Sequence, residues 1–367
     1  MHIRSIEPFA VSLPMVKPLI MAGEEVRRAE NMLVRITTDD GQIGWGEAAA
    51  APTMTGETVA SMVAAVHYVA PDLVARDAAD IAGAVKAMGG RMYANHGAKA
   101  AIEIALHDLL GRATGRPVHA LIGNKRRNRL PLMSPIGGGD IDDDAREAAL
   151  KKASGVTAFK IKVGIDTPAN DAARTRAICA ALRDGCLISA DANQGFTTEE
   201  AIAFAQAVAD AGLDFIEQPV AADDLDGMAA VAAATNIATG ADEGIHSAAD
   251  IARHHERGAA RGVSLKAIKL GGIQAVVVAG RLADDLGMRV NVSCKTGESS
   301  IGCAAALHVA SVIPNVAWGL TLTHTGLAED VVTDPIRAEH GYANVPDRPG
   351  LGVEVDEDRV RRYQAPV

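Results

Sequence analysis

The stretch Phe159-Lys-Ile-Lys-Val-Gly is a short apolar run that carries a charged residue, Lys162, at its end. Four more runs of this kind follow, and each ends in one acid or lysine: Asp191, Glu217, Asp242 and Lys266. Successive members of the set are separated by 29, 26, 25 and 24 positions, which suits one strand, one helix and two loops of a β/α barrel. The spacing therefore predicts that each charged residue lies at the carboxyl end of a parallel strand, where barrel enzymes hold their active sites.

The chain from residue 126 to residue 328 repeats this alternation. Its strand candidates are residues 130–134, 158–163, 187–190, 215–217, 237–239, 263–268, 289–293 and 316–320. Alanine-rich helical runs separate them, which predicts an α/β fold of the TIM-barrel type. An open doubly wound sheet is the alternative, but the G-x-G-x-x-G fingerprint of a dinucleotide site is missing. We expect no helix directly after Gly137-Gly-Gly, which also argues against such a site.

Residues 1–125 have a different pattern. Strands are predicted over 3–13 and 32–37, with a hairpin at Asp39-Asp-Gly, and helices over 58–69 and 98–111. Strands followed by helices predict an α+β domain. The segment 329–367, with Pro335, Pro346 and Pro349 among its residues, is expected to return to this first domain.

Composition limits the possible partners. The chain of 367 residues has a formal net charge of −10 and no long basic run, so nucleic acid and anionic membranes are not expected to bind. The N-terminus lacks the apolar core of a signal peptide, and the apolar stretch 301–320 is interrupted by His308, Ser311 and Pro314. The four cysteines show no C-x-x-C spacing, so we expect reduced thiols and a cytoplasmic protein. Cys294 falls at a strand end near the predicted site, although a small apolar filler is the favoured interpretation.

The charged residues predict a metal site. Residues two apart on a strand share a face, so Lys160 points the same way as Lys162, and Asn193 the same way as Asp191. Buried charges must pair or bind a metal, because their desolvation is costly. Three carboxylates without arginine partners in their motifs favour a hard divalent cation, Mg²⁺ or else Mn²⁺.

The flanking lysines predict acid/base chemistry. A desolvated lysine near other cations has a lowered pKa and can act as a base. A metal-bound carboxylate has a more acidic α-proton, so lysines on both sides of a planar enediolate could remove and deliver that proton. A Schiff-base aldolase with Lys162 as nucleophile is the alternative enzyme class, and a structural protein without activity is a third hypothesis. Lys269, three residues beyond Lys266, is expected to face the other way and to be structural.

These motifs resemble the enolase superfamily, in particular its muconate lactonizing enzyme subgroup. The resemblance extends over nearly the whole chain. Besides the strand-end residues it rests on Gly41-Gln-Ile-Gly-Trp-Gly-Glu, Ala98-Lys-Ala-Ala-Ile-Glu-Ile-Ala-Leu-His-Asp-Leu, Gly115-Arg-Pro-Val-His-Ala-Leu-Ile-Gly, Lys269-Leu-Gly-Gly-Ile and Leu327-Ala-Glu-Asp-Val. It implies an α+β capping domain (1–125), a modified TIM barrel of (β/α)7β type (126–328), a C-terminal segment (329–367) that returns to the cap, and a homo-oligomer.

The resemblance also implies roles for individual residues. Asp191, Glu217 and Asp242 would be the metal ligands, and Lys162 and Lys266 the acid/base catalysts. Lys160 would lower the basicity of Lys162, and Glu243 would support the ligands. Glu298 resembles a family glutamate at the end of the seventh strand. The histidine of the mandelate racemase branch is absent from Val292-Ser-Cys-Lys-Thr, which favours the lysine pair.

Substrate specificity is the least determined feature. Dipeptide epimerases of the subgroup resemble one another in an Asp-x-Asp after the eighth strand, and many muconate cycloisomerases carry a glutamate there. This chain has Leu320-Thr-Leu-Thr-His-Thr, with neither acid. Positive charge is available instead from Lys295 and His324, and from Arg27 and Arg28 if these are not simply solvated.

These features favour a small carboxylate substrate with extra negative charge, such as a dicarboxylate or an N-acyl amino acid. We expect an isomerase, either a muconate cycloisomerase-like (lactonizing) enzyme or a racemase/epimerase of an N-substituted amino acid, with a dehydratase on the same scaffold as a further alternative. Segments 21–28 and 52–56 would form the lid, since family members close two such loops over the substrate.

Overall fold

A computed structural model describes residues 1–21, 24–137, 140–182 and 185–366. Its centre is a parallel sheet of eight strands in chain order. The strands are β5 (Met133–Ile136), β6 (Ala158–Lys162), β7 (Leu187–Asp191), β8 (Phe215–Glu217), β9 (Ala238–Ala241), β10 (Gly262–Leu265), β11 (Arg289–Ser293) and β12 (Leu320–Thr321). A parallel bridge between Leu132 and Leu320 brings the last strand against the start of the first, so the barrel is nearly closed.

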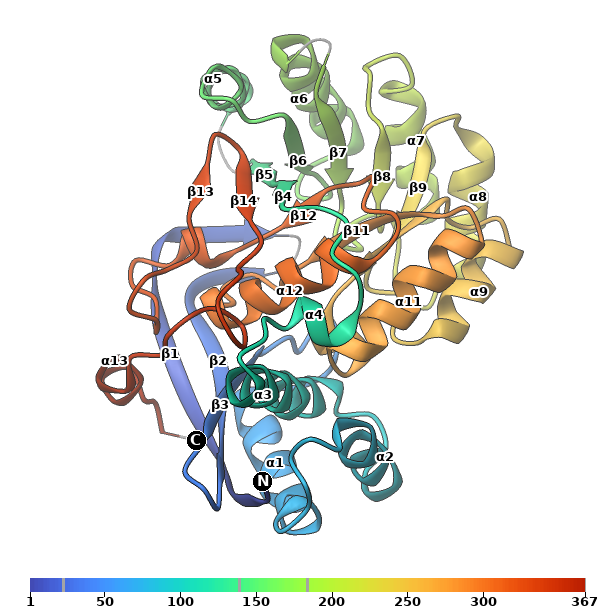
Figure 1. The fold of residues 1–367 in the computed structure, drawn as a ribbon. Helices are drawn as coiled ribbons and strands as arrows, with labels where there is room; N and C mark the ends of the chain where they lie inside the picture. Colours follow the sequence, from blue (N-terminus) through green and yellow to red (C-terminus); the bar gives the residue numbers. More distant parts are fainter. Residues whose placement is uncertain (22–23, 138–139, 183–184, 367) are drawn as a thin grey trace.

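Seven helices follow the first seven strands, which gives the expected (β/α)7β order. They are α5 (Ile141–Ala153), α6 (Pro168–Leu182), α7 (Thr198–Ala207), α8 (Leu225–Ala234), α9 (Ala248–Glu256), α11 (Ile273–Asp285) and α12 (Ser300–Val312). A single turn, α10 (Ala267–Leu270), lies between β10 and α11. Figure 1 shows α6 to α9 and α11 around the outside of the strands. None of the helices among the described residues has both the length and the apolarity needed to cross a bilayer.

An aromatic pair closes the amino end of the barrel. Phe215 begins β8, and its ring stacks on that of Trp318 with centroids 3.9 Å apart. Gly240 and Gly262 make room for this indole, because a Cβ added to either would lie 2.9 Å or 2.3 Å from a Trp318 ring carbon. The amino end is therefore packed with side chains, which leaves the carboxyl end for chemistry.

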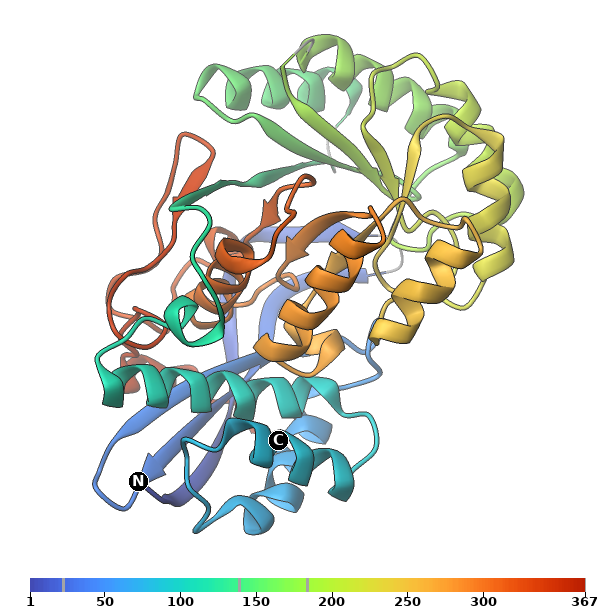
Figure 2. The ribbon, with the colours of Figure 1, turned by 45° about the vertical axis from the view of Figure 1, so that its right-hand side comes forward.

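The N-terminal domain is an antiparallel sheet covered by helices, as predicted. The sheet contains β1 (Ile3–Met21), β2 (Glu24–Thr38) and β3 (Ile43–Ala49), and the helices are α1 (Val59–Leu73), α2 (Ile81–Arg91), α3 (His96–Thr114) and α4 (His119–Ile122). Helix α3 packs directly on β3, and a Cβ at Gly46 would lie 1.9 Å from the Ala101 carbonyl oxygen. Figure 2 shows α3 across the sheet and below α11.

Two buried glutamates of this cap bind the amino ends of barrel helices. Glu47 on β3 accepts hydrogen bonds from the backbone N–H groups of Ser299 and Gly302, at 2.9 Å and 2.8 Å. Glu103 on α3 accepts from the N–H groups of Ile273 and Gln274, at 2.8 Å and 3.0 Å. A carboxylate at a helix amino end is stabilised by unpaired N–H groups and the helix dipole. These contacts fix the cap against the loops at the carboxyl end of the barrel.

The C-terminal segment contacts both parts of the chain. The short strands β13 (Ala338–Glu339) and β14 (Tyr342–Asn344) form a small sheet with β4 (Arg129–Pro131). Beyond them, Glu357 of α13 (Glu357–Arg362) pairs with Arg35 of β2 at 2.9 Å, and the Ala365 N–H donates to the Ala10 carbonyl oxygen at 3.0 Å. The last residues thus run along the cap sheet.

Several boundaries differ from the predictions. The predicted strand 130–134 is split between β4 and β5, and 316–320 yields only the two residues of β12. The predicted strand 263–268 ends at Leu265, and the chain then turns into α10. The expectation that no helix follows the glycines at 137 was wrong, because Asp140 caps α5 with a 2.8 Å hydrogen bond from the Asp143 N–H. Gly137 directly follows β5, and the other two glycines of the run lie outside the described residues.

Candidate active site

The strand register brings the predicted charged residues together. Lys162 lies beside Asp191, and Asp191 lies beside Glu217, on the adjacent strands β6, β7 and β8. Asp242 and Lys266 are the first residues after β9 and β10. All five therefore lie at the carboxyl end of the barrel, where parallel strands present their last side chains to a common cavity.

Each carboxylate of this cluster is paired with ammonium groups. The Lys160 Nζ lies 2.5 Å from Glu217 Oε2 and 3.6 Å from Asp191 Oδ2. The Lys162 Nζ donates to Asp191 Oδ2 at 2.7 Å and to Asn193 Oδ1 at 2.6 Å. Lys266 binds Oδ2 of Asp242. The cluster is thus a network in which acids from three strands alternate with lysines.

Two further residues that the sequence analysis did not single out support the acids. The Ser264 hydroxyl donates to Glu217 Oε1 at 2.8 Å, and the Gln218 amide oxygen accepts from the Asp242 backbone N–H at 2.9 Å. Gln218 and Asn193 have φ values of 35° and 42°, a region that non-glycine residues adopt uncommonly. Ser264 could have been found, because it lies two residues before Lys266 on the same face, whereas nothing in the sequence distinguishes Gln218.

Lys269 corrects a prediction. It was expected to face away from the site, but its Nζ donates to Asp242 Oδ1 at 2.6 Å and to the Ser264 carbonyl oxygen at 3.0 Å. Its side chain is fully buried. Asp242 is therefore held by two lysines, one on each carboxylate oxygen.

Two opposing effects set the pKa values of the acids in the cluster. Burial disfavours the charged carboxylate, whereas pairing with an ammonium group favours it. Burial favours the neutral acid at Asp191, but Lys162 and Lys160 outweigh it and hold the pKa below its ordinary value. At Glu217 burial dominates over Lys160, and the pKa is raised. Burial and the neighbouring Asp242 raise the pKa of Glu243 to about 7.

The expected lowering of a catalytic lysine pKa is not present at Lys266 in this arrangement. Burial opposes its charge, but Asp242 and Glu243 raise its pKa above the ordinary value. The pKa of Lys160 is likewise raised, because Glu217 and Asp191 outweigh its burial. Both lysines are therefore protonated as long as these carboxylates lie beside them.

The donor chemistry suits a hard divalent cation, although the side chains are not gathered around one. No group of three His, Cys, Asp or Glu side chains within the described parts of the chain is arranged to hold a metal. The available oxygens nevertheless come from buried carboxylates, the ligand type that Mg²⁺ prefers. Glu243 also has a buried oxygen, Oε2, without a hydrogen-bond partner, while its Oε1 accepts from Asn193 Nδ2 at 3.1 Å. Each of the three predicted ligands is instead paired with at least one lysine.

The remaining predicted residues lie at the ends of β11 and β12. Glu298 is buried, and burial together with Glu47 raises its pKa to about 8. His324 donates through Nε2 to the Ile336 carbonyl oxygen at 2.7 Å. The Lys295 carbonyl oxygen accepts a hydrogen bond from the Thr323 hydroxyl at 2.8 Å. Lys295 is also buried. These three residues follow the seventh and eighth strands, as predicted from their positions.

Cys294 is more than an apolar filler, because it takes part in a buried polar group. Its thiol is hydrogen-bonded to Cys303, which raises the pKa of Cys294. Burial favours the neutral thiol at Cys303, but hydrogen bonds from Cys294 and His324 hold its pKa well below the ordinary value. All four cysteines are free thiols.

One of the two predicted lid segments contacts the cluster of charged residues. Met54, in segment 52–56, places its Sδ 3.9 Å from the Lys266 Nζ, so this segment reaches the cluster. Residues 22 and 23 of segment 21–28 lie outside the described residues. Arg27 and Arg28 are exposed on β2, and the Arg28 Nε donates to the Ser12 hydroxyl at 2.7 Å.

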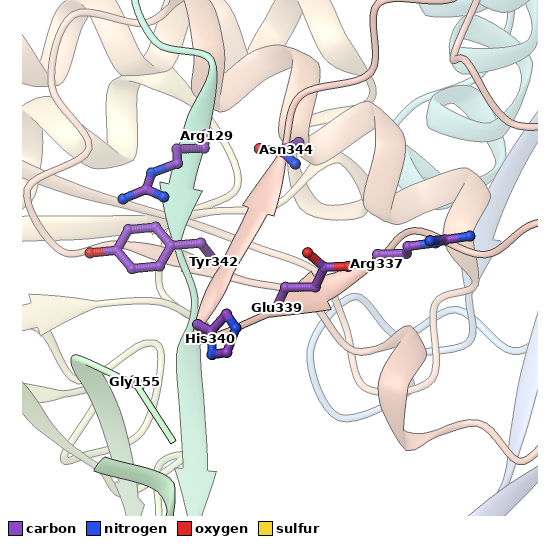
Figure 3. A pocket seen from close by; sticks show the side chains of 7 residues that line it. All are labelled: Arg129, Gly155, Arg337, Glu339, His340, Tyr342 and Asn344. Carbon is purple, nitrogen blue, oxygen red and sulfur yellow. The ribbon is translucent and has the colours of Figure 1, made fainter. Parts of the chain in front are cut away.

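A hollow of about 500 Å³ lies away from this cluster, beside the small sheet of β4, β13 and β14. Figure 3 shows its lining residues. The guanidinium of Arg129 lies over the Tyr342 ring at 4.3 Å from its centroid, and Arg337, Glu339, His340 and Asn344 complete the polar wall. The hollow contains none of the predicted site residues.

Comparison with known proteins assigns both domains. Residues 5–123 match the sequence profile of the mandelate racemase/muconate lactonizing enzyme N-terminal domain, and residues 143–359 match that of the enolase C-terminal domain-like family. A chloromuconate cycloisomerase from Cupriavidus pinatubonensis is 33% identical over 362 residues, 96% of each chain. An N-succinyl-L-Arg/Lys racemase from Bacillus cereus is 30% identical and covers 98% of this chain and 97% of its own. The crystal structure of 2-chloromuconate cycloisomerase from Rhodococcus opacus 1CP superposes with a TM-score of 0.95 at 30% identity over 100% of both chains.

Proposed function

The chain belongs to the mandelate racemase/muconate lactonizing enzyme family of the enolase superfamily and is an isomerase, and we propose that it moves a proton at the carbon next to a substrate carboxylate. The observation that carries this proposal is the placement of the two lysines. Lys162 ends β6 and Lys266 follows β10, four strands apart in an eight-stranded barrel. They therefore face each other across the mouth, and a planar intermediate between them has one lysine on each side.

We propose muconate cycloisomerase-like activity as the main function. A carboxylate oxygen at one end of the substrate adds to the double bond conjugated with the other carboxylate. The electron pair of that bond moves onto the second carboxylate, and a lysine ammonium then delivers a proton to the α-carbon.

We propose Mg²⁺, or Mn²⁺, as the cofactor, with Asp191, Glu217 and Asp242 as the residues that would hold it. Such an ion supplies stabilisation for the negative charge that develops on the substrate carboxylate. Its binding requires Lys160 and Lys266 to release the oxygens with which they pair. The freed ammonium groups are then available to the substrate.

Racemisation of an N-acyl amino acid is the second candidate. It is supported by the opposed lysines and by the N-succinyl amino acid racemase among the relatives. One lysine removes the α-proton, the electron pair enters the carboxylate, and the opposite lysine delivers a proton to the other face. This reaction needs both lysines, whereas lactonization needs only one to deliver its proton.

Proton exchange in D₂O, followed by NMR with Mg²⁺ present, tests the proposal. The panel contains cis,cis-muconate, chloromuconates, muconolactone and both enantiomers of N-succinyl amino acids. Deuterium incorporation at the α-carbon that disappears with a chelator supports the chemistry, and the reactive compound identifies the substrate class. Absence of exchange across muconates, lactones and N-acyl amino acids would overturn the substrate assignment.

Single-lysine variants distinguish the two candidates. For a racemase, Lys162→Ala and Lys266→Ala each lose racemisation, and each retains exchange with only one enantiomer. For a cycloisomerase, only one of the two variants loses the proton delivery that completes turnover, while the other loses substrate binding. Lys86→Ala, on the exposed face of α2, is the matched control. Unchanged activity in both site variants would refute the assignment of the lysines.

A further inference from the structure

The side chain of Lys269 is enclosed by the backbone of two strand ends. Its Nζ contacts three oxygens: Oδ1 of Asp242 at 2.6 Å, the Asp242 carbonyl oxygen, and the Ser264 carbonyl oxygen at 3.0 Å. An ammonium group has three N–H donors, so each has an acceptor. With a relative exposure of 0%, this group has no access to solvent or to a substrate.

The backbone around Lys269 is fixed from the other side. Lys269 belongs to the single turn α10, whose first residues follow β10 directly. Its carbonyl oxygen receives a hydrogen bond from the His96 Nδ1 on cap helix α3, at 2.5 Å. The turn α10 is therefore fixed by β10 before it and by His96 against the Lys269 carbonyl oxygen. The position of the Lys269 ammonium group is fixed with it, so this group can orient Asp242.

Lys266 has different surroundings from Lys269. It binds the other oxygen of Asp242, Oδ2, and also lies 3.9 Å from the Met54 sulfur in the predicted lid segment. Lys266 therefore stands at the cavity, between Asp242 and the lid. The two oxygens of Asp242 thus have different partners, one sealed in the protein and one facing the site.

We propose that Lys269 is a positioning residue that holds Oδ1 of Asp242 and so presents Oδ2 to an incoming divalent cation in place of Lys266. This inference rests on the proposed function, because it concerns the same metal site. At Asp242 the cation would displace only Lys266, and the contacts of Lys269 would stay as they are. Cation binding then releases Lys266 toward the substrate while Asp242 keeps its orientation.

A simpler role for Lys269 predicts the opposite change in cation affinity when the lysine is removed. If the lysine only contributed positive charge, its removal would reduce repulsion and tighten cation binding. If it orients Asp242, its removal leaves a ligand that must be ordered by the cation itself, and binding weakens. Loss of a residue that orients a metal ligand typically lowers metal affinity about 10- to 100-fold.

Equilibrium Mn²⁺ binding, measured by the EPR signal of free Mn²⁺, tests the inference without a substrate. The proteins are the wild type, Lys269→Met, Lys269→Gln and the control Lys86→Met on the exposed face of α2. Lys269→Met removes charge and donors, whereas Lys269→Gln removes the charge but keeps an N–H₂ donor. We expect the Kd for Mn²⁺ to rise about 10- to 100-fold in Lys269→Met and less in Lys269→Gln, with no change in Lys86→Met. Circular dichroism and the melting temperature establish that each variant is folded, and Lys269→Gln carries the test if Lys269→Met is not.

The outcomes separate the two levels of the proposal. Wild-type Mn²⁺ binding that weakens in the Lys269 variants supports the positioning role. Wild-type binding with an equal or lower Kd in the variants overturns that role and leaves the metal site of the proposed function in place. Absence of Mn²⁺ binding by the wild type would overturn the metal site, and the positioning role with it.

Discussion

His308 should make the stability of this protein sensitive to mild acid. The ring lies in α12 with no exposed surface. Its Nδ1 accepts a hydrogen bond from the His119 backbone N–H at 3.2 Å, and its Nε2 contacts the Leu351 carbonyl oxygen at 3.1 Å. A nitrogen that accepts from an N–H cannot carry a proton, so the ring must be neutral with its hydrogen on Nε2. Burial, helped by the nearby His119 and Lys125, lowers the pKa of His308 to about 3.

The magnitude follows from the difference between the folded and unfolded states. In the unfolded chain this histidine has a pKa of about 6.5. Because the folded pKa is lower, the contribution to stability is complete above the unfolded pKa and is lost as the pH falls toward about 3. Each pH unit in that window costs about 1.4 kcal/mol. Between pH 7 and pH 5 the neutral His308 should therefore account for a loss of about 2 kcal/mol.

The assay is urea unfolding at several pH values between 7 and 5, followed by the fluorescence of the two buried tryptophans. We compare the wild type with His308→Gln, in which an amide replaces the imidazole and no group titrates. The free energy of unfolding of the variant should be lower at pH 7 but should fall less with acid, by about 2 kcal/mol over this range. His67→Gln, at an exposed position of α1, is the matched control. Parallel pH profiles for the wild type and His308→Gln would refute the reasoning.

Four further variants test packing within the cap and contacts between the cap and the barrel. Glu47→Gln places an amide N–H₂ against the donors of α12 and should lower the free energy of unfolding by about 1–3 kcal/mol; an unchanged urea midpoint would show that this contact does not hold the domains together. Gly46→Ala forces a Cβ to within 1.9 Å of a helix α3 carbonyl oxygen and should greatly reduce soluble yield and melting temperature. Gly90→Ala, which has open space around the new Cβ in α2, should instead raise stability by about 0.5–1 kcal/mol, and equal effects of the two substitutions would contradict the packing argument. Met54→Ala should raise KM several-fold without lowering the melting temperature, and an unchanged KM would exclude segment 52–56 as part of the lid.

The strand-end residues could be predicted because two simple regularities act together. A parallel barrel places the last residue of every strand at one end, so spacing along the chain is enough to bring Lys162, Asp191 and Glu217 to a common mouth. Side chains alternate along a strand, which correctly put Lys160 on the same face as Lys162. Neither regularity depends on knowing how the chain packs.

Lys269 was missed because the alternation of a strand was applied beyond the end of β10. The strand stops at Leu265, and Lys266 precedes the turn α10 with extended φ and ψ values of −129° and 136°. The helical turn that follows then brings Lys269 back toward the side of Lys266, so both lysines reach Asp242. The turn α10 packs against α3, where His96 binds the Lys269 carbonyl oxygen, and the local sequence does not reveal such a distant contact.

The apolar run 316–320 was predicted as a strand for a related reason. Trp318 and Leu320 are buried, but Trp318 packs on Phe215 inside the barrel, and Gly319 has a φ of 75°. The run is apolar because it closes the amino end of the barrel. Only Leu320 and Thr321 reach the ladder. Burial alone does not separate a strand from a segment that plugs the core.

The charge of the buried cluster constrains the substrate of the proposed reaction. Its lysines are Lys160, Lys162, Lys266 and Lys269, and its acids are Asp191, Glu217, Asp242 and Glu243. With Glu243 ionised these formal charges cancel, so a divalent cation adds two uncompensated positive charges to a desolvated site, which is costly. A substrate with a net charge of −2, such as a muconate, restores the balance with every lysine protonated, which is the state required to deliver a proton during lactonization. A substrate with a net charge of −1 restores it only if one lysine gives up its proton, which is the state required of a base in racemisation. The net charge of the substrate and the reaction are therefore linked: in the exchange panel cis,cis-muconate should be consumed by addition, whereas an N-succinyl amino acid with a cationic side chain, which has a net charge of −1, should exchange its α-proton.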